Sequence, residues 1–306
     1  MNWLLVGMLT ALTVSAQTPA ERAQTLNMEG NRVAETGDYP EARRLYSDAI
    51  VIWRSLGDEH YRTVTNMNLL ANNYLMMGSP ERADALYREA LLMERKLFPA
   101  DIQTARTLEG LAYGLVRTRQ PREALPLAEE ALRIATQSTG EGSVDTALAY
   151  SSVAEVYRTM GDGARALPLY RHSRALYEKA VGPSHPRVAA ILSQEGLILM
   201  QDGKLALAEQ SMVQAVKLLK NSCPGCLTEL SIAQSNLGLL NLRRKRYREA
   251  DEAYSAAIEL REKFAVSAGP ELADSLQSLA VVREKEHLFD DAARLNTRAQ
   301  LIRGYR

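Results

Sequence analysis

The sequence has no excess charge of either sign and no long apolar run after its first residues. Its 306 residues carry 37 Lys and Arg side chains against 37 Asp and Glu, so the formal net charge is zero. A neutral chain has no overall field to draw it onto nucleic acid or an anionic membrane. Charges interrupt every later apolar run, which excludes a second membrane span. Glycine (18) and proline (11) are modest and no low-complexity tract occurs, so the chain is predicted to be ordered.

The short motifs of the common enzyme chemistries are also missing. No G-x-S-x-G elbow, phosphate-binding loop, H-E-x-x-H zinc motif or dinucleotide fingerprint occurs. The four histidines do not share a helix face with other ligands at metal-binding spacing. Acidic residues are abundant, but they do not pair in a recognisable site. We therefore predict a protein that is not an enzyme, that holds no metal and no cofactor, and that has no small-molecule substrate.

The N-terminal segment differs from the rest of the chain. An uncharged apolar run extends from Trp3 to Val14, and small residues follow it up to Ala16. The run is too short to span a bilayer and ends in a cleavage-like pattern, which predicts a signal peptide over residues 1–16 and an exported protein, periplasmic or secreted, that begins at Gln17. Because no Lys or Arg precedes the run, an uncleaved anchor and a misplaced start codon are the alternatives.

Internal repetition decides the predicted architecture. The stretch "TGDYPEARRLYSDAI" at residues 36–50 returns along the whole chain, and one alanine is kept in every copy. These anchor alanines, 41 or 42 residues apart, are Ala42, Ala83, Ala124, Ala166, Ala208, Ala250 and Ala292. Twelve residues before each anchor stands Gly or Ala, and seven after it stands Ala or Ser. Periods of this length indicate stacked supersecondary units, and small residues at fixed positions indicate helices that cross closely, ~8–10 Å apart.

Proline and glycine predict where the two helices of each repeat begin and end. Glycine stands five residues before several anchors, in the predicted turn between the helices, and proline often follows it in the first turn of the second helix. The first helix is predicted to open with a capping box from Thr18 to Glu21. Pro126 and Pro168 lie two residues after their anchors, so the second helices of repeats three and four are predicted to start late or to kink.

These repeating positions resemble the tetratricopeptide repeat. The period near 42 and linkers such as "AVGPSHPRVA" resemble the longer subtype found in kinesin light chains, from about Gln24 to the C-terminus. Ala128, Met212 and Asn296 depart from the tyrosine that the pattern places four residues after the anchor. The resemblance implies an all-α fold over residues 17–306, a right-handed superhelical solenoid of seven antiparallel helix pairs. It also implies that the first helices line a concave groove that binds partners.

A groove lined by the first helices would expose an inner stripe at four positions of each repeat, which lie 18, 15, 11 and 7 or 8 residues before the anchor. The candidate partner-binding residues on this stripe are Asn27, Asn31, Asn68, Asn72, Arg106, Glu109, Tyr113, Arg117, Glu155, Arg158, Leu197, Leu239 and Arg243. The asparagines could bond an extended peptide backbone, the arginines an acidic side chain and the leucines an apolar one. Alternatively, the asparagines belong to the repeat consensus and the leucines pack between repeats.

Both cysteines lie in "CPGC", in the predicted connection between repeats five and six. Pro at the second and Gly at the third position predict a type II turn, whose ends approach within ~7 Å and permit a disulfide between Cys223 and Cys226. A zinc site would need two more ligands, and a thioredoxin-like site would need a βαβ context. Because Cys226 is predicted near a helix start, where the dipole lowers a thiol pKa, a redox-active pair is the alternative.

Together these features predict a protein-interaction scaffold that binds an extended peptide or a partner protein, and no nucleic acid. The basic run at residues 243–249 falls in a predicted turn and is interpreted as solvated. His60 and His185 occupy the same position of two linkers, where each could cap or pack against a helix start. The alternative functions are an envelope thiol–disulfide protein that uses the cysteine pair, and a cytoplasmic adaptor or regulatory subunit if the N-terminal segment is not a signal.

Overall fold

The computed structural model describes residues 17–57, 61–97, 100–263 and 269–304, and within them it contains fourteen α-helices and no strand. The predicted signal peptide, residues 1–16, lies outside the described residues, as does His60. The helices are α1 (Pro19–Glu35), α2 (Tyr39–Ser55), α3 (Tyr61–Met76), α4 (Pro80–Leu97), α5 (Ile102–Arg117), α6 (Pro121–Thr139), α7 (Val144–Thr159), α8 (Gly163–Val181), α9 (Pro186–Gln201), α10 (Leu205–Ser222), α11 (Leu227–Arg243), α12 (Tyr247–Glu262), α13 (Gly269–Lys285) and α14 (Phe289–Gly304).

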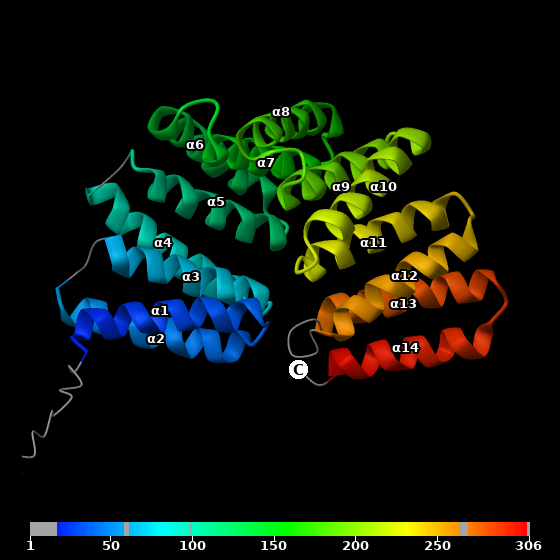
Figure 1. The fold of residues 1–306 in the computed structure, drawn as a ribbon, viewed down its shortest axis with the longest axis horizontal. Coiled ribbons are helices and arrows are strands. Elements are labelled where there is room, and N and C mark those ends of the chain that lie inside the picture. Colours follow the sequence, from blue (N-terminus) through cyan, green and yellow to red (C-terminus); the bar gives the residue numbers. More distant parts are fainter. Residues whose placement is uncertain (1–16, 58–60, 98–99, 264–268, 305–306) are drawn as a thin grey trace, which may run out of the picture.

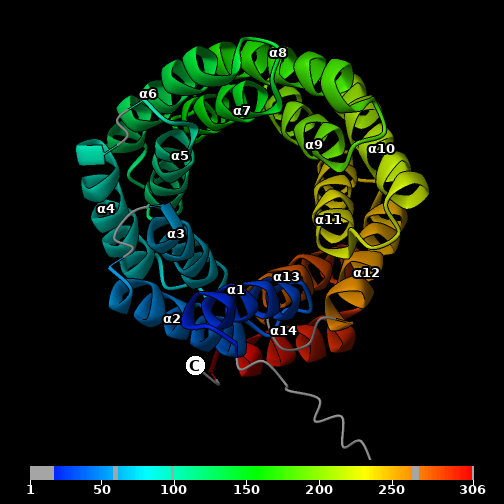
Figure 2. The ribbon, with the colours of Figure 1, turned by 60° about the vertical axis from the view of Figure 1, so that its left-hand side comes forward.

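The helices form seven antiparallel pairs that stack into an arch (Figure 1). Figure 2, which looks along the axis of the arch, shows the odd-numbered helices as an inner ring and the even-numbered helices as an outer ring. From α1 in front to α13 behind, the chain winds clockwise as it recedes, so the superhelix is right-handed. The predicted fold class is confirmed.

Several helix starts have the caps that the sequence predicted. The Thr18 side chain accepts a hydrogen bond from the Glu21 amide (3.2 Å), and the Glu21 carboxylate accepts one from the Thr18 amide (2.8 Å), which completes the capping box. His185 caps α9, where its Nδ1 accepts from the Arg187 amide at 3.2 Å while its ring stacks on Tyr177. The late start predicted for α6 and α8 is wrong, because both helices begin before their internal prolines, Pro126 and Pro168.

Small residues lie where the two helices of each repeat cross. All seven anchor alanines have between 0 and 2% of their surface exposed, and the two other small positions are buried in every repeat. The space that a missing side chain leaves is filled by the residue four positions after the anchor. A Cβ atom on Gly30 would lie 2.7 Å from the Tyr46 ring, and one on Gly196 would lie 2.7 Å from Met212. The small residue therefore makes room for its large partner, and the two side chains pack together at the helix crossing.

The connection between α10 and α11 carries both cysteines. The Cys226 amide donates to the Cys223 carbonyl at 3.0 Å, and the two Cα atoms lie 5.3 Å apart in a disulfide-bonded pair. The predicted turn is present, but its type is wrong, because Gly225 lacks the positive φ that type II requires at the third position. Glycine adopts either sign of φ, so "PG" alone does not fix the turn type.

Replacing both cysteines with serine should lower the free energy of unfolding by about 2 kcal/mol or less and leave the fold intact, because the closed loop is short. Urea denaturation of the variant and of the wild-type protein under reducing conditions should give the same midpoint. A variant that loses insulin-reductase activity present in the wild type would instead support the redox alternative.

Candidate functional site: the inner channel

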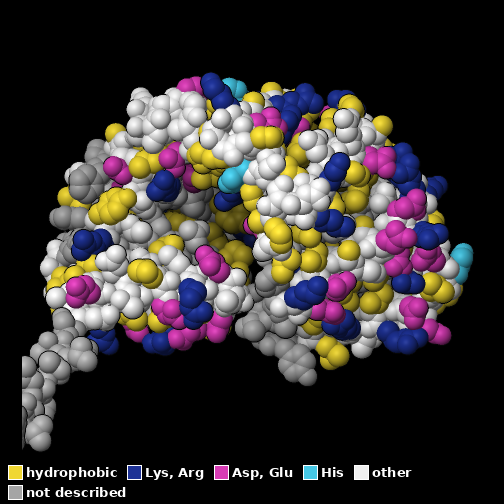
Figure 3. Space-filling model, in the orientation of Figure 1, with side chains coloured by type: hydrophobic (Ala, Val, Ile, Leu, Met, Phe, Trp, Pro, Cys, Tyr) yellow, Lys and Arg dark blue, Asp and Glu magenta, His cyan; other side chains and the backbone are white. Residues whose placement is uncertain are grey.

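The odd-numbered helices line the inner face of the superhelix (Figure 2), and the hollow that they enclose is called the channel. The space-filling view shows it as a deep hollow between the two arms of the arch, with apolar side chains in its depth (Figure 3). Each wall helix packs on its own outer helix and on the next repeat, which leaves one narrow stripe facing the channel. Of the predicted stripe residues, Asn31, Asn72, Arg106, Tyr113, Arg117 and Arg243 are exposed. Asn27, Glu109, Glu155, Arg158, Leu197 and Leu239 are half-buried, and Asn68 is buried.

Tyrosines of the outer helices hold three polar stripe residues in place. The hydroxyl of Tyr46 donates to Asn31 Oδ1 at 2.8 Å, and that of Tyr87 donates to Asn72 Oδ1 at 2.7 Å. In the fourth repeat Tyr170 donates to Glu155 Oε2 at 2.5 Å from the equivalent position. The oxygens of the two asparagines therefore have donors within the protein, and what Asn31 and Asn72 offer the channel is their amide nitrogens.

Asn68 differs from its neighbours on the stripe. Its exposed fraction is 8%, and its Nδ2 donates to Thr107 Oγ1 of the next repeat at 2.6 Å. The side chain therefore lies in the contact between α3 and α5 and not open in the channel. The sequence prediction placed Asn68 in the channel because it considered the positions of one helix at a time. In the structure the side chain bends toward the neighbouring repeat.

Two of the four predicted arginines already have carboxylate partners. Arg106 pairs with Asp145 at 2.9 Å, and Arg158 pairs with Glu155 in two hydrogen bonds of 2.8 and 2.5 Å. Arg117 contacts only the Tyr113 hydroxyl, at 3.4 Å, within the described part of the chain.

Glu109 lies half-buried in the channel wall, one turn before Tyr113. Burial raises the pKa of its carboxyl to about 8, and the negative charge of Asp145 also raises it. The positive charges of Arg106 and Arg187 lower the pKa, but by less. At neutral pH the group is therefore mostly protonated, and the wall at this point offers a neutral carboxyl that can donate or accept a hydrogen bond.

Apolar side chains of the channel wall were missed by the sequence prediction. Met76, Ile232 and Val281 belong to inner helices and are exposed to between 41 and 46%. Ile232 and Val281 lie 18 and 11 residues before their anchors, so the stripe rule applied to every repeat would have found them. Together with the 44% exposed ring of Tyr113, they give the channel apolar contact points in four of its seven repeats.

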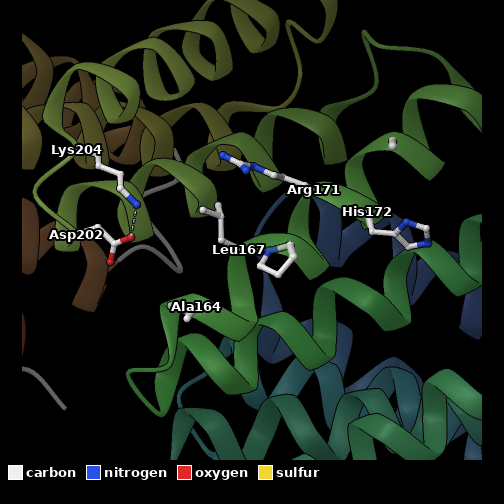
Figure 4. Close-up of a pocket in the computed structure, with 9 residues that line it drawn as sticks. Ala164, Leu167, Arg171, His172, Asp202 and Lys204 are labelled. Atoms are coloured by element: carbon white, nitrogen blue, oxygen red, sulfur yellow. Dashed lines mark hydrogen bonds and ion pairs between the residues drawn. The ribbon is translucent and has the colours of Figure 1, made fainter.

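A second hollow, of about 600 Å³, lies outside the channel, between α8 and the turn that joins α9 to α10 (Figure 4). Arg171 and His172 reach it from α8, and Lys204, paired with Asp202 at 3.2 Å, reaches it from the turn. Within the residues that the structure describes, no group of three His, Cys, Asp or Glu could hold a metal ion. No helix in that part of the chain is long and apolar enough to cross a membrane.

The predicted basic run is largely paired. Arg244 and Arg246 both bind Glu209 of α10, the second of them at 2.5 Å, across the turn from α11 to α12. The run therefore connects two repeats and is not a free cationic patch.

The repeat architecture agrees with comparison to known protein families. The tetratricopeptide repeat family matches residues 21–96 and 145–221, which is half of the chain, and further versions of the repeat match 104–145 and 233–264. The chain belongs to the tetratricopeptide repeat family.

Several solved structures share this arrangement of helices. A Rap protein complexed with competence and sporulation factor has a TM-score of 0.72 and 17% identity, covering 95% of this chain and 77% of its own. The apo form of RapI has a TM-score of 0.67 and 12% identity, covering 92% of this chain and 97% of its own. Kinesin-light-chain-like repeats of Podosopora anserina have a TM-score of 0.54 and 19% identity, covering 67% of this chain and 97% of their own. At these identities the likeness shows the fold alone.

Proposed function

We propose that this tetratricopeptide repeat protein is a non-catalytic scaffold that binds an extended segment of a partner protein in its inner channel. The observation that carries the proposal is the channel wall itself. Polar groups that tyrosines hold in place lie in the first, second and fourth repeats, and exposed apolar side chains lie in the second, third, sixth and seventh. Scattered single apolar residues are normal on a surface, but their recurrence along one concave face is typical of a binding surface. The complex of a similarly folded Rap protein with competence and sporulation factor supports a binding role for this architecture.

The wall groups define the segment that would fit. The amide nitrogens of Asn31 and Asn72 can donate to backbone carbonyls, since their oxygens already accept from tyrosines. Ile232, Leu239 and neighbouring side chains would receive apolar residues. Of the arginines, Arg117 and Arg243 are the ones that would meet an acidic residue, because Arg106 and Arg158 are neutralised within the wall.

Substitution of the channel residues tests the proposal. The double variant Tyr113→Ala, Ile232→Ala should bind the partner isolated from a native extract at least tenfold more weakly, because an anchor side chain that becomes buried at the centre of an interface costs ~2 kcal/mol or more when it is truncated. The matched control is Val51→Ala, Leu92→Ala, which removes side chains that are 68 and 66% exposed on outer helices. Isothermal titration calorimetry measures both. Equal weakening by the two variants, or none by the first with folding retained, would move the site off the channel.

Export is the second part of the proposal, and it is supported by the apolar N-terminal run together with the paired cysteines, which are typical of an oxidising compartment. We expect the protein purified from the cell envelope to begin at Gln17. N-terminal sequencing that finds Met1 in that material would contradict it.

A further inference from the structure

A buried polar cluster connects the second and third repeats, away from the channel surface. Glu94 of α4 is 3% exposed, and its Oε1 accepts a hydrogen bond from Thr107 of α5 at 3.0 Å. Thr107 Oγ1 accepts in turn from Asn68 Nδ2 of α3 at 2.6 Å. The cluster therefore joins three helices, and two of them carry the channel wall.

Two atoms of this cluster lack a partner, and both are acceptors when Glu94 is ionised. Glu94 Oε2 and Asn68 Oδ1 are buried without a hydrogen bond. Buried polar atoms are rarely left unpaired, because each such atom loses its water without replacement. Both side chains bond the same hydroxyl, Thr107 Oγ1. A proton on Glu94 Oε2 would turn this acceptor into a donor, and the oxygen of the neighbouring Asn68 is an acceptor without a partner.

Equivalent positions in other repeats show that a carboxyl is unusual here. The site eleven residues after the anchor holds Trp53, Ala135, Tyr177 and Leu219 in four other repeats. In the sixth repeat it holds Arg261, which donates to Ser275, the counterpart of Thr107, and Ser275 approaches Ser235, the counterpart of Asn68, at 3.3 Å. That second cluster has a guanidinium where the first has a carboxyl, and a guanidinium keeps its protons at all physiological pH values.

We propose that the contact between the second and third repeats is a proton switch, in which protonated Glu94 closes a ring of hydrogen bonds with Thr107 and Asn68, and loss of the proton opens the ring. With the carboxylate ionised, a negative charge and an unpaired amide oxygen remain in the contact between α3, α4 and α5. The contact then loosens. The switch is independent of what the channel binds, although it lies between the wall helices that carry Asn72 and Arg106.

The surroundings of Glu94 place its titration near neutral pH. Burial raises the pKa of Glu94 to about 7, against the lowering effect of the Thr107 bond, and the charge of Asp101 adds to the rise. The titratable groups that share a small cavity with Glu94 are Tyr61 from α3 and Asp101 from the N-cap of α5. No Lys or Arg of the described residues lines that cavity. Neither neighbour can neutralise the carboxylate.

The proton that Glu94 binds makes the stability of the fold depend on pH. A carboxyl whose pKa is raised in the folded state keeps its proton while the unfolded chain releases it, so stability falls as the pH rises from the ordinary value of 4.5 to about 7. For these two values Glu94 contributes about a tenfold rise in the unfolding equilibrium constant between pH 6 and pH 8, in addition to the rise that Glu109 contributes.

The variant Glu94→Gln imitates the closed ring, because its amide oxygen accepts from Thr107 and its amide nitrogen donates to Asn68 at every pH. Urea denaturation should show that the unfolding equilibrium constant rises about tenfold less between pH 6 and pH 8 in the variant than in the wild type, and that the variant is more stable than the wild type at pH 8. The matched control is Glu89→Gln on the same helix, an exposed carboxyl, which should keep the wild-type pH dependence. At pH 8, hydrogen exchange of α4 and α5 should be slower in Glu94→Gln, with exchange of α11 and α12 unchanged.

Titration of the wild-type protein tests the switch without any variant. Carbon-13 resonances of the Glu94 carboxyl should titrate near pH 7, and Thr107→Val should move the midpoint upward, because the bond that favours the ionised form is lost. A midpoint near 4.5, or the same pH dependence of stability in wild type and Glu94→Gln, would overturn the proposal.

Discussion

Replacing Tyr87 with alanine is expected to lower the free energy of unfolding by about 3–5 kcal/mol, as for other large aromatic residues in packed cores. Its ring is 1% exposed and fills the space left by Gly110 of the next repeat, where a Cβ atom would lie 2.5 Å from the ring. Its hydroxyl also bonds Asn72. One side chain thus joins the second repeat to the third, and in a solenoid each repeat is stabilised mainly by its neighbours.

Two matched variants serve as controls. One tests the contribution of the Tyr87 hydroxyl, and the other tests the loss of a tyrosine that is not buried. Tyr87→Phe keeps the ring and should cost only about 1 kcal/mol for the lost hydrogen bond. Tyr113→Ala removes a tyrosine that is 44% exposed and should change stability by no more than about 0.5 kcal/mol. Urea denaturation followed by far-UV circular dichroism measures all three. A loss in Tyr87→Ala no larger than in Tyr87→Phe would show that the ring does not connect the repeats.

Introducing leucine at Ala166 should lower the free energy of unfolding by about 1–3 kcal/mol, because the larger side chain forces α7 and α8 apart. Ala166 has no exposed surface, and Ala154, which marks the same crossing on α7, has none either. The central position of this repeat means that the disturbance reaches neighbours on both sides. A melting curve identical to that of the wild type would contradict the assignment of Ala166 to the helix crossing.

The control for that substitution lies on the same helix. Ala175 of α8 is exposed, so Ala175→Leu makes the same chemical change without entering the crossing. We expect its free energy of unfolding to stay within about 0.5 kcal/mol of the wild-type value.

The sequence predicted the repeat architecture well because the relevant forces are local and recur. Each feature acts within one repeat. The anchor alanines, 41 or 42 residues apart, mark the helix crossings, and the glycines before them and the capping box at Thr18 mark helix ends. The twenty-one small positions are all buried in the structure, as close helix crossing requires. Of the late start or kink predicted from Pro126 and Pro168, the late start is wrong, because α6 and α8 begin at Pro121 and Gly163 and continue through these prolines, which are exposed.

The candidate site was predicted less completely. The helical period shows which residues share a helix face, but it does not show which side chains of other helices bond to them. It placed Asn31 and Asn72 on the channel wall, yet could not show that tyrosines of the outer helices already bond their oxygens. It also could not show that Arg106 and Asp145, 39 residues apart, form an ion pair between neighbouring wall helices.

The sequence by itself determined the number of helix pairs and the columns of small residues, because both follow from the repeat period and from close helix crossing within one repeat. Only the tertiary structure decided which polar groups are neutralised, which are buried and which remain free. Asn68, Glu94 and Thr107 show the reason, since they come from three helices and meet only because adjacent repeats stack at one particular rotation. That rotation is set by side-chain packing between repeats, which no short stretch of the chain encodes.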